Sequence, residues 1–155
     1  MSTKKKTIRI ILSILFTAAV ALLGSYFTDT DSAWYQNLSR PALQPPAIVF
    51  PIVWTALYAL FAASLAISAV HPETTKKTQW LYAMSGVLNV LWSYVFFARQ
   101  NPGGALIVLA LLIITAVLLF WNVCQTSKTA AYLLLPYIVW LFFAFYLNYE
   151  IAFLN

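Results

Sequence analysis

Five long apolar runs, almost free of charged residues, constrain what this chain can fold into. The expected helices cover approximately residues 8–27, 47–70, 79–98, 103–124 and 129–153. An apolar run of about 18 or more residues is long enough to cross the hydrocarbon core of a bilayer as an α-helix. The sequence therefore predicts an all-α integral membrane protein. Residues 1–155 would form a single five-helix bundle with a long structured loop between the first two helices.

The composition agrees with this class of protein. Hydrophobic residues make up 63% of the 155 residues and charged residues only 8%, whereas soluble domains carry about 25% charged residues. A cleaved signal peptide is the alternative for the first run, because Lys4–Lys6 precede it. A signal peptide has an apolar core of about 7–15 residues and a small-residue cleavage site. The run here is longer and ends in GSYFTDTD, so we favour a retained helix.

Basic residues are unevenly divided between the two sides of the predicted bundle. The N-terminal side, which includes the second and fourth connections, carries Lys4, Lys5, Lys6, Arg9, Lys76, Lys77 and Lys128. The opposite side carries only Arg40 and Arg99. Because cytoplasmic segments are enriched in Lys and Arg, we expect the N-terminus in the cytoplasm and the C-terminus outside the plasma membrane. The net charge of +5 then reflects topology, and its dispersal over short segments argues against nucleic acid as a partner.

The single cysteine and the single histidine do not indicate a metal site or a disulfide. Cys124 ends an apolar run, where a buried cysteine is usually inert. His71 begins the connection HPETTKK and has no second histidine with which to share a metal ion. We therefore predict no metal and no obligatory cofactor.

The connection between the first two helices, residues 27–46, is the longest in the chain. Loops beyond about 12–15 residues without structure of their own are usually functional or disordered. A solvated linker has no use for apolar side chains, and this one carries Trp34, Tyr35, Leu38 and Leu43. We predict that the segment folds over the mouth of the bundle as a lid, with Leu43 pointing down onto a ligand.

Aromatic rings and amides recur inside the predicted helices in place of charges. Glu150 is the only acidic residue within them and lies near a helix end, which disfavours an ion-coupled transporter. Three of the helices each carry such aromatic or amide residues on one face. The three sets are Trp54, Tyr58 and Phe61; Asn89, Trp92 and Phe96; and Trp140, Ala144, Leu147 and Asn148. Interfacial tryptophan and interhelical asparagine also occur for packing alone. Taken together, the three faces predict a ring-lined cavity for a large, flat, apolar ligand.

Four stretches of the sequence resemble the motifs of one family, the translocator protein or TspO family, also called peripheral-type benzodiazepine receptors. The segment WYQNLSRPALQPP is similar to the family pattern WY-x-x-L-x-[KR]-P-x-[WL]-x-PP, and Trp54–Tyr58 matches W-x-x-L-Y. The segment LNVLWSYVFF is similar to LN-x-x-W-x-x-x-FF, and LLLPYIVWLFFAFYLN is similar to L-x-PY-x-x-W-x-x-FA-x-x-LN. The matches keep their order over nearly the whole chain, which makes the resemblance specific.

The resemblance implies a cavity beneath the first loop that binds porphyrins such as protoporphyrin IX, as ligand or substrate, and synthetic benzodiazepine-site ligands. It implies that Trp54 and Trp140 face the bound ring and, as in bacterial members, support its light- and oxygen-dependent breakdown, which makes them the candidate catalytic residues. It also implies a homodimer in the lipid bilayer, formed through the third helix, where Ala83–Gly86 supplies small residues. The predicted ligand-binding residues are Trp34, Leu43, Pro45, Trp54, Tyr58, Asn89, Trp92, Phe96, Trp140, Ala144, Leu147 and Asn148.

Two positions depart from the family patterns. Leu43 stands where many members carry a second tryptophan, which removes one stacking surface from the lid. The sterol-recognition pattern of Leu or Val, then Tyr, then Lys or Arg is incomplete because no basic residue follows Tyr149, so we expect no tight cholesterol binding. The leading hypothesis is a membrane protein that binds, senses or degrades tetrapyrroles. The alternatives are a transporter of porphyrin or of another small apolar metabolite, and a non-catalytic interaction scaffold.

Overall fold

Helices make up 79% of the computed structural model, which describes residues 2–155. Its elements are α1 (Thr3–Phe27), α2 (Ala33–Gln36), α3 (Val49–Val70), α4 (Lys76–Ser93), the π-helical turn η1 (Tyr94–Ala98), α5 (Pro102–Cys124), α6 (Lys128–Tyr132) and α7 (Leu135–Leu154). Five helical stretches are long and apolar enough to cross a membrane, with α4 and η1 forming one of them and α6 and α7 another. The predicted all-α, five-helix membrane fold is confirmed.

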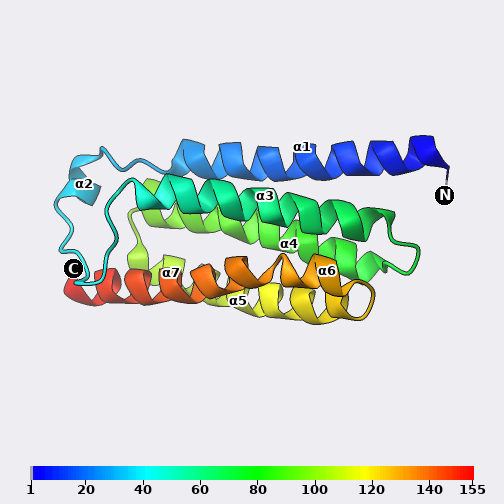
Figure 1. Ribbon diagram of the computed structural model, residues 1–155. Coiled ribbons are helices and arrows are strands. Elements are labelled where there is room, and N and C mark those ends of the chain that lie inside the picture. The colour runs from blue at the N-terminus through cyan, green and yellow to red at the C-terminus, as the bar shows by residue number, and fades with distance from the viewer. Residues whose placement is uncertain (1) are drawn as a thin grey trace.

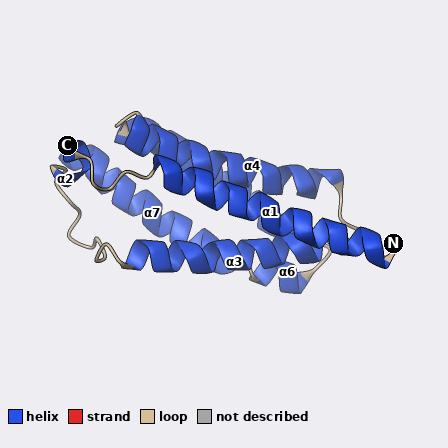
Figure 2. Ribbon diagram, turned by 90° about the horizontal axis from the view of Figure 1, so that it is seen from above, coloured by secondary structure: helices blue, strands red, loops and turns tan. Residues whose placement is uncertain are grey.

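The long helices lie side by side, and the two chain termini lie at opposite ends of the bundle (Figure 1). Helix α1 packs on α3 and α4, while α5 packs on α4 and α7. Helix α3 packs closely on α1 and on the short α6 but only lightly on α7. Seen from above, α3 and α7 diverge toward the end that carries α2 and the C-terminus (Figure 2). The bundle is therefore tight at the N-terminal end and opens at the other.

The tight part of the core is built on one face of α5. Its buried residues recur every three or four positions: Ala105, Leu109, Leu112, Ala116, Leu119 and Val123. This spacing places them on one stripe of the helix, which faces α4 and α7. The opposite face exposes large apolar side chains such as Ile107, Ile114 and Trp121. In a membrane-spanning helix, such a face meets lipid.

A network of buried hydroxyl groups joins three helices in the N-terminal half of the bundle. The hydroxyl of Tyr82 lies 2.6 Å from Ser64 Oγ and 3.0 Å from Ser68 Oγ, and Ser64 donates to the carbonyl oxygen of Ala130 at 2.7 Å. These bonds join α3, α4 and α6, and the side chains that make them are buried. Unpaired polar groups are costly in hydrocarbon, so the network holds this end of the bundle together.

Two helices are irregular where the sequence predicted continuous runs. The last run, 129–153, is divided by a turn at Leu133 and Leu134, because Pro136 has no N–H to donate to the carbonyl oxygen of Tyr132. At the end of α4, the N–H of Arg99 bonds the carbonyl oxygen of Tyr94 at 3.0 Å, which is the i to i−5 pairing of a π-helix. Apolar periodicity does not reveal either feature.

The basic segments named above gather at one end of the bundle. Figure 1 places the N-terminus, the α3–α4 connection and the α5–α6 connection together at the end opposite to α2. Helix α1 begins at Thr3, earlier than expected, so that Lys4–Lys6 are helical. Arg9 donates to the carbonyl oxygen of Ala69 in the last turn of α3 at 2.8 Å, which satisfies a free carbonyl group at a helix C-terminus.

The small residues of the predicted dimer segment are largely used inside the chain. Ser85 and Gly86 are buried, and a Cβ on Gly86 would lie 2.7 Å from Phe16 Cζ and 2.9 Å from Val20 Cγ2 of α1. Gly86 thus allows α1 to approach α4 closely and is not presented to a second copy. The homodimer itself stays a prediction, and the exposed face of α4 that could serve it carries Trp80, Met84, Val87 and Leu91.

Candidate functional site

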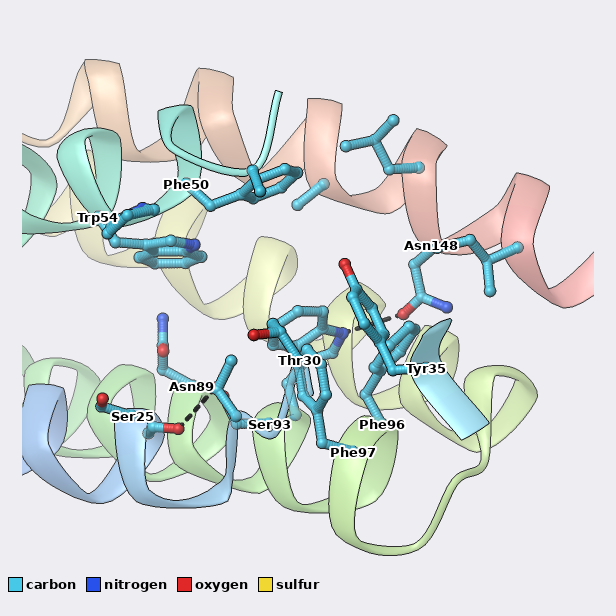
Figure 3. Close-up of a pocket in the computed structure, with 18 of the residues that line it drawn as sticks. Ser25, Thr30, Tyr35, Phe50, Trp54, Asn89, Ser93, Phe96, Phe97 and Asn148 are labelled. Carbon is cyan, nitrogen blue, oxygen red and sulfur yellow. Dashed lines mark hydrogen bonds between the residues drawn. The ribbon is translucent and has the colours of Figure 1, made fainter. Parts of the chain in front are cut away.

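A cavity of about 620 Å³ occupies the open end of the bundle. This volume is typical of sites for small molecules and cofactors, which range from about 300 to 1,000 Å³. Its walls come from α1, α3, α4, η1 and α7, and its mouth from the connection at residues 28–48. Figure 3 shows Phe50 and Trp54 on one side of the open space and Asn89 and Ser93 on the opposite side.

The wall formed by α3 and α7 is aromatic. The rings of Trp54 and Tyr58 lie 5.5 Å apart, centroid to centroid, at an interplanar angle of 31°. The ring of Phe50 meets that of Trp140 edge to face at 6.0 Å. All four side chains line the cavity. The structure therefore brings the two candidate catalytic tryptophans to one cavity from two different helices.

The facing wall is also made of rings, and the π-helical turn shapes it. Trp92 and Phe96 lie 5.5 Å apart and are tilted by 30°, while Phe96 and its neighbour Phe97 meet at 4.8 Å. Both phenylalanines line the cavity. Isolated π-helical turns are frequent at functional sites because they alter which side chains a helix presents. Here the turn coincides with the aromatic wall.

The two predicted amide residues are engaged mainly by the protein itself. Asn89 accepts a hydrogen bond from Tyr58 Oη at 2.8 Å and donates one to Tyr137 Oη at 3.0 Å. Asn148 accepts from Trp92 Nε1 at 2.9 Å and donates to the carbonyl oxygen of Pro102 at 2.9 Å. Both line the cavity, yet their main effect is to orient the rings of Tyr58 and Trp92.

Two other polar atoms on the cavity wall have no partner within residues 2–155. They are the indole N–H of Trp140, a donor, and Gln44 Oε1, an acceptor, and both atoms are buried. A buried polar atom without a hydrogen bond is costly. These atoms are the ones best suited to meet polar groups of a ligand.

Nine of the twelve predicted binding residues line the cavity, and three do not. The nine are Trp54, Tyr58, Asn89, Trp92, Phe96, Trp140, Ala144, Leu147 and Asn148. Trp34 lies behind the wall, where its ring packs edge to face on Phe96 at 5.7 Å. Leu43 is 66% exposed and does not point onto the cavity, and Pro45 also lies outside its lining. The mouth is formed instead by Tyr35, Gln36, Arg40 and Gln44.

Helix α1 contributes a wall that the sequence analysis missed. Ala21, Gly24, Ser25 and Thr28 line the cavity beside Ser93 of α4. Small residues at a spacing of three or four form one face of a helix, so the pattern was present in the sequence. It carries no aromatic or charged group and was therefore overlooked. Small side chains here leave the space that a flat ligand needs.

The cavity offers little for a metal ion. Within residues 2–155, no three His, Cys, Asp or Glu side chains lie close enough together to hold one. Cys124 ends α5, and His71 follows α3 at the opposite end of the bundle from α2. The chemistry of the site rests on rings, two unpartnered polar atoms and the polar mouth.

The fold and the cavity define an integral membrane protein of five membrane-spanning helices with an aromatic-lined cavity at one end. The family model described as TspO/MBR matches residues 13–154, and the chain belongs to this family.

Named relatives align over most of the chain. Identity is 37% to the tryptophan-rich protein TspO of Chlorobaculum tepidum, covering 97% of this chain and 98% of that protein. It is 34% to the tryptophan-rich sensory protein of Cereibacter sphaeroides, covering 91% of each. It is also 34% to the human translocator protein, covering 86% of this chain and 84% of that protein.

Proposed function

We propose that this protein binds a tetrapyrrole such as protoporphyrin IX in its cavity and acts in porphyrin sensing or homeostasis. The observation that carries the proposal is the pair of aromatic walls, Trp54 with Tyr58 and Trp92 with Phe96, that line a single cavity of about 620 Å³. A flat macrocycle buries a large apolar area and stacks well on such rings. The name of the Cereibacter sphaeroides relative, a sensory protein, agrees with such a role.

The floor of the cavity favours binding over transport. Beneath Tyr58 and Asn89 the bundle is filled by buried rings, with Phe61 5.5 Å from Tyr137 and 5.4 Å from Tyr82. The hydroxyl network of Tyr82 closes the bundle beyond them. A ligand that enters from the mouth therefore meets a packed core, and its passage through the bundle would require that core to open.

We further propose that the bound porphyrin is degraded in light and oxygen. The porphyrin absorbs the light and dioxygen is the oxidant. Addition of O₂ across one methine C=C bond, followed by cleavage of that C–C bond and of the O–O bond, opens the ring with two new C=O groups and needs no external reductant. No acid–base pair or nucleophile is required. Trp54 and Trp140, which lie on the same wall, act by presenting electron-rich indole rings to the bound porphyrin, and phenylalanine would not match these rings.

Single substitutions of the two tryptophans test this chemistry. Trp54→Phe and Trp140→Phe should each abolish the light-dependent loss of protoporphyrin fluorescence, while dark binding is largely kept because phenylalanine still offers a ring. Matched controls are Trp80→Phe and Trp121→Phe, whose side chains are 72% and 68% exposed on the outer surface. Decay rates that are unchanged in both cavity variants would refute the degradative role and leave the binding role standing.

The proposal also covers the membrane in which the protein lies, its orientation and its dimer surface. We propose that the chain lies in the plasma membrane with its basic end in the cytoplasm, as the uneven distribution of Lys and Arg favours. The cavity mouth then faces the outer side. The exposed apolar faces meet lipid, and α4 provides the surface of a homodimer.

A further inference from the structure

The mouth of the cavity contains one basic side chain. Arg40 is the only Lys, Arg or His among the residues of the 2–155 range that line the cavity. Everything deeper in the cavity is apolar, aromatic or neutral. A ligand that carries a negative charge would therefore find a cation at one place only.

The position of Arg40 is held by contacts on both sides. Its guanidinium carbon lies 5.1 Å from the centroid of the Tyr35 ring, and that ring in turn packs on Phe97 of the cavity wall at 5.4 Å. Such a cation–π contact attracts the guanidinium to the face of the ring. The guanidinium is thereby kept over the aromatic mouth instead of extending freely into solvent.

The backbone next to Arg40 is fixed to α7. The side-chain amide of Asn155 accepts a hydrogen bond from Ser39 N at 2.8 Å and donates one to the carbonyl oxygen of Ser39 at 3.2 Å. The same amide nitrogen bonds the carbonyl oxygen of Ile151 at 2.8 Å. We refer to these three bonds as the Asn155 clip. With the clip and the Tyr35 ring in place, little ordering is needed for Arg40 to meet a ligand.

The charge around the mouth is not generally positive. Asp29 and Asp31 precede α2, and Glu150 lies near the C-terminal end of α7, so acidic residues also occur at the end of the bundle that carries Arg40. Asp31 itself lines the mouth. Within residues 2–155, no carboxylate lies within ion-pair distance of Arg40. Attraction of an anion would thus depend on direct contact with this one guanidinium and not on the summed electrostatic potential of this end of the bundle.

We propose that Arg40 is a carboxylate-recognition residue, and that the cavity prefers flat apolar ligands that bear an acidic side chain at one edge. The proposal rests on the function proposed above and sharpens its ligand class. The macrocycle would lie between the aromatic walls, and a propionate at its edge would accept paired hydrogen bonds from the guanidinium. Arginine suits this contact because its planar N–H groups match both oxygens of a carboxylate.

The test compares protoporphyrin IX with its dimethyl ester, which has the same ring but no carboxylate. Binding of each to the full-length protein in detergent is measured in the dark by quenching of tryptophan fluorescence. Hydrogen bonds to a charged group contribute about 1.5–3 kcal/mol, so Arg40→Gln should weaken binding of the free acid roughly tenfold or more. Binding of the ester should change less than about twofold. Arg40→Lys should restore part of the affinity, because lysine keeps the charge without the paired geometry.

A matched control variant and the wild-type protein distinguish failure of this proposal from failure of the proposed tetrapyrrole function. Arg99→Gln removes a cation at the same end of the bundle that does not line the cavity, and it should leave both affinities unchanged. Equal weakening of acid and ester by Arg40→Gln would indicate a structural role and overturn the proposal, as would no change in either. If the wild-type protein binds neither compound, the proposed tetrapyrrole function itself fails.

Discussion

At the scale of the residue, the side chains that matter most in the cavity are those whose neighbours fix their orientation. Asn148 and Asn89 hold the rings of Trp92 and Tyr58 through hydrogen bonds of 2.8–2.9 Å. The N–H of Trp140 and Gln44 Oε1, by contrast, have no hydrogen-bond partner among residues 2–155. The cavity thus combines aromatic walls oriented by hydrogen bonds with two unpartnered polar atoms, the combination of apolar lining and few polar groups that is typical of small-molecule sites.

Gly86 provides a residue-scale test of how the bundle packs. Gly86→Ala should lower the unfolding temperature, because the new methyl group would overlap Phe16 and Val20 and overpacking costs about 1–3 kcal/mol. That cost exceeds the gain of about 0.5–1 kcal/mol from replacing glycine by alanine within a helix. Thermal unfolding in detergent measures the change.

The control is Gly103→Ala, where a Cβ would meet only Asn101 Oδ1 at 3.7 Å. This variant should unfold at the wild-type temperature or above. If Gly86→Ala were equally stable, α1 and α4 would not pack as closely as described.

The structure places the predicted side chains of the regular helices on the cavity wall and those of the connection outside it. Helical spacing is fixed, so Trp54, Asn89 and Trp140 could be assigned to an inner face from the sequence. No such period applies to residues 28–48, where Trp34 packs behind Phe96 and Leu43 is exposed. Which loop side chain faces inward depends on turns and tertiary contacts that a single sequence does not reveal.

At the level of the elements, the α1–α3 connection is attached to the helices by a small number of identifiable contacts. It contains only the single-turn helix α2, capped by Ser32 Oγ, which accepts from Tyr35 N at 3.3 Å. Its rings pack on η1 through Trp34 and Tyr35. Beyond these rings, the Asn155 clip is its main tie to α7. An element held by so few contacts can open without unfolding the bundle.

Removal of the clip should loosen this connection. In Asn155→Ala, amide hydrogen exchange over residues 33–43 should accelerate roughly tenfold, since each lost hydrogen bond contributes about 0.5–1.5 kcal/mol. Hydrogen exchange followed by mass spectrometry measures this effect, and the transmembrane helices should keep their protection. The control is Asn122→Ala, because the amide of Asn122 bonds only the carbonyl oxygen of Leu118 in its own helix. Unaltered exchange over residues 33–43 would show that the clip does not restrain the connection.

The irregular helical elements could not be predicted from apolar periodicity. The turn between α6 and α7 follows from Pro136, a signal that was present in the sequence but was read as part of one continuous run. The π-helical turn η1 has no such marker, because Tyr94–Ala98 is apolar and aromatic like the helix before it. Its formation depends on how α4 meets α1 and α5.

At the scale of the whole molecule, five apolar helices were predictable because a membrane requires every backbone group to be paired within the segment. Rings on three helical faces also predicted a ring-lined cavity, and the family resemblance implied that it lies beneath the first connection. The divergence of α3 and α7, which creates the cavity, was not predictable. It depends on α6 filling the space beside α3 at the opposite end.

The central claim is that this cavity, and not the lipid-facing surface, binds the tetrapyrrole. The most direct test is a titration with protoporphyrin IX in the dark, comparing the wild-type protein with Ala144→Trp. Ala144 lines the cavity between Trp140 and Asn148, so a bulky ring there should fill the space and abolish binding. Val139→Trp, on the same helix but 68% exposed, should bind one porphyrin per chain as the wild type does. Unchanged binding by Ala144→Trp would show that the tetrapyrrole binds outside this cavity.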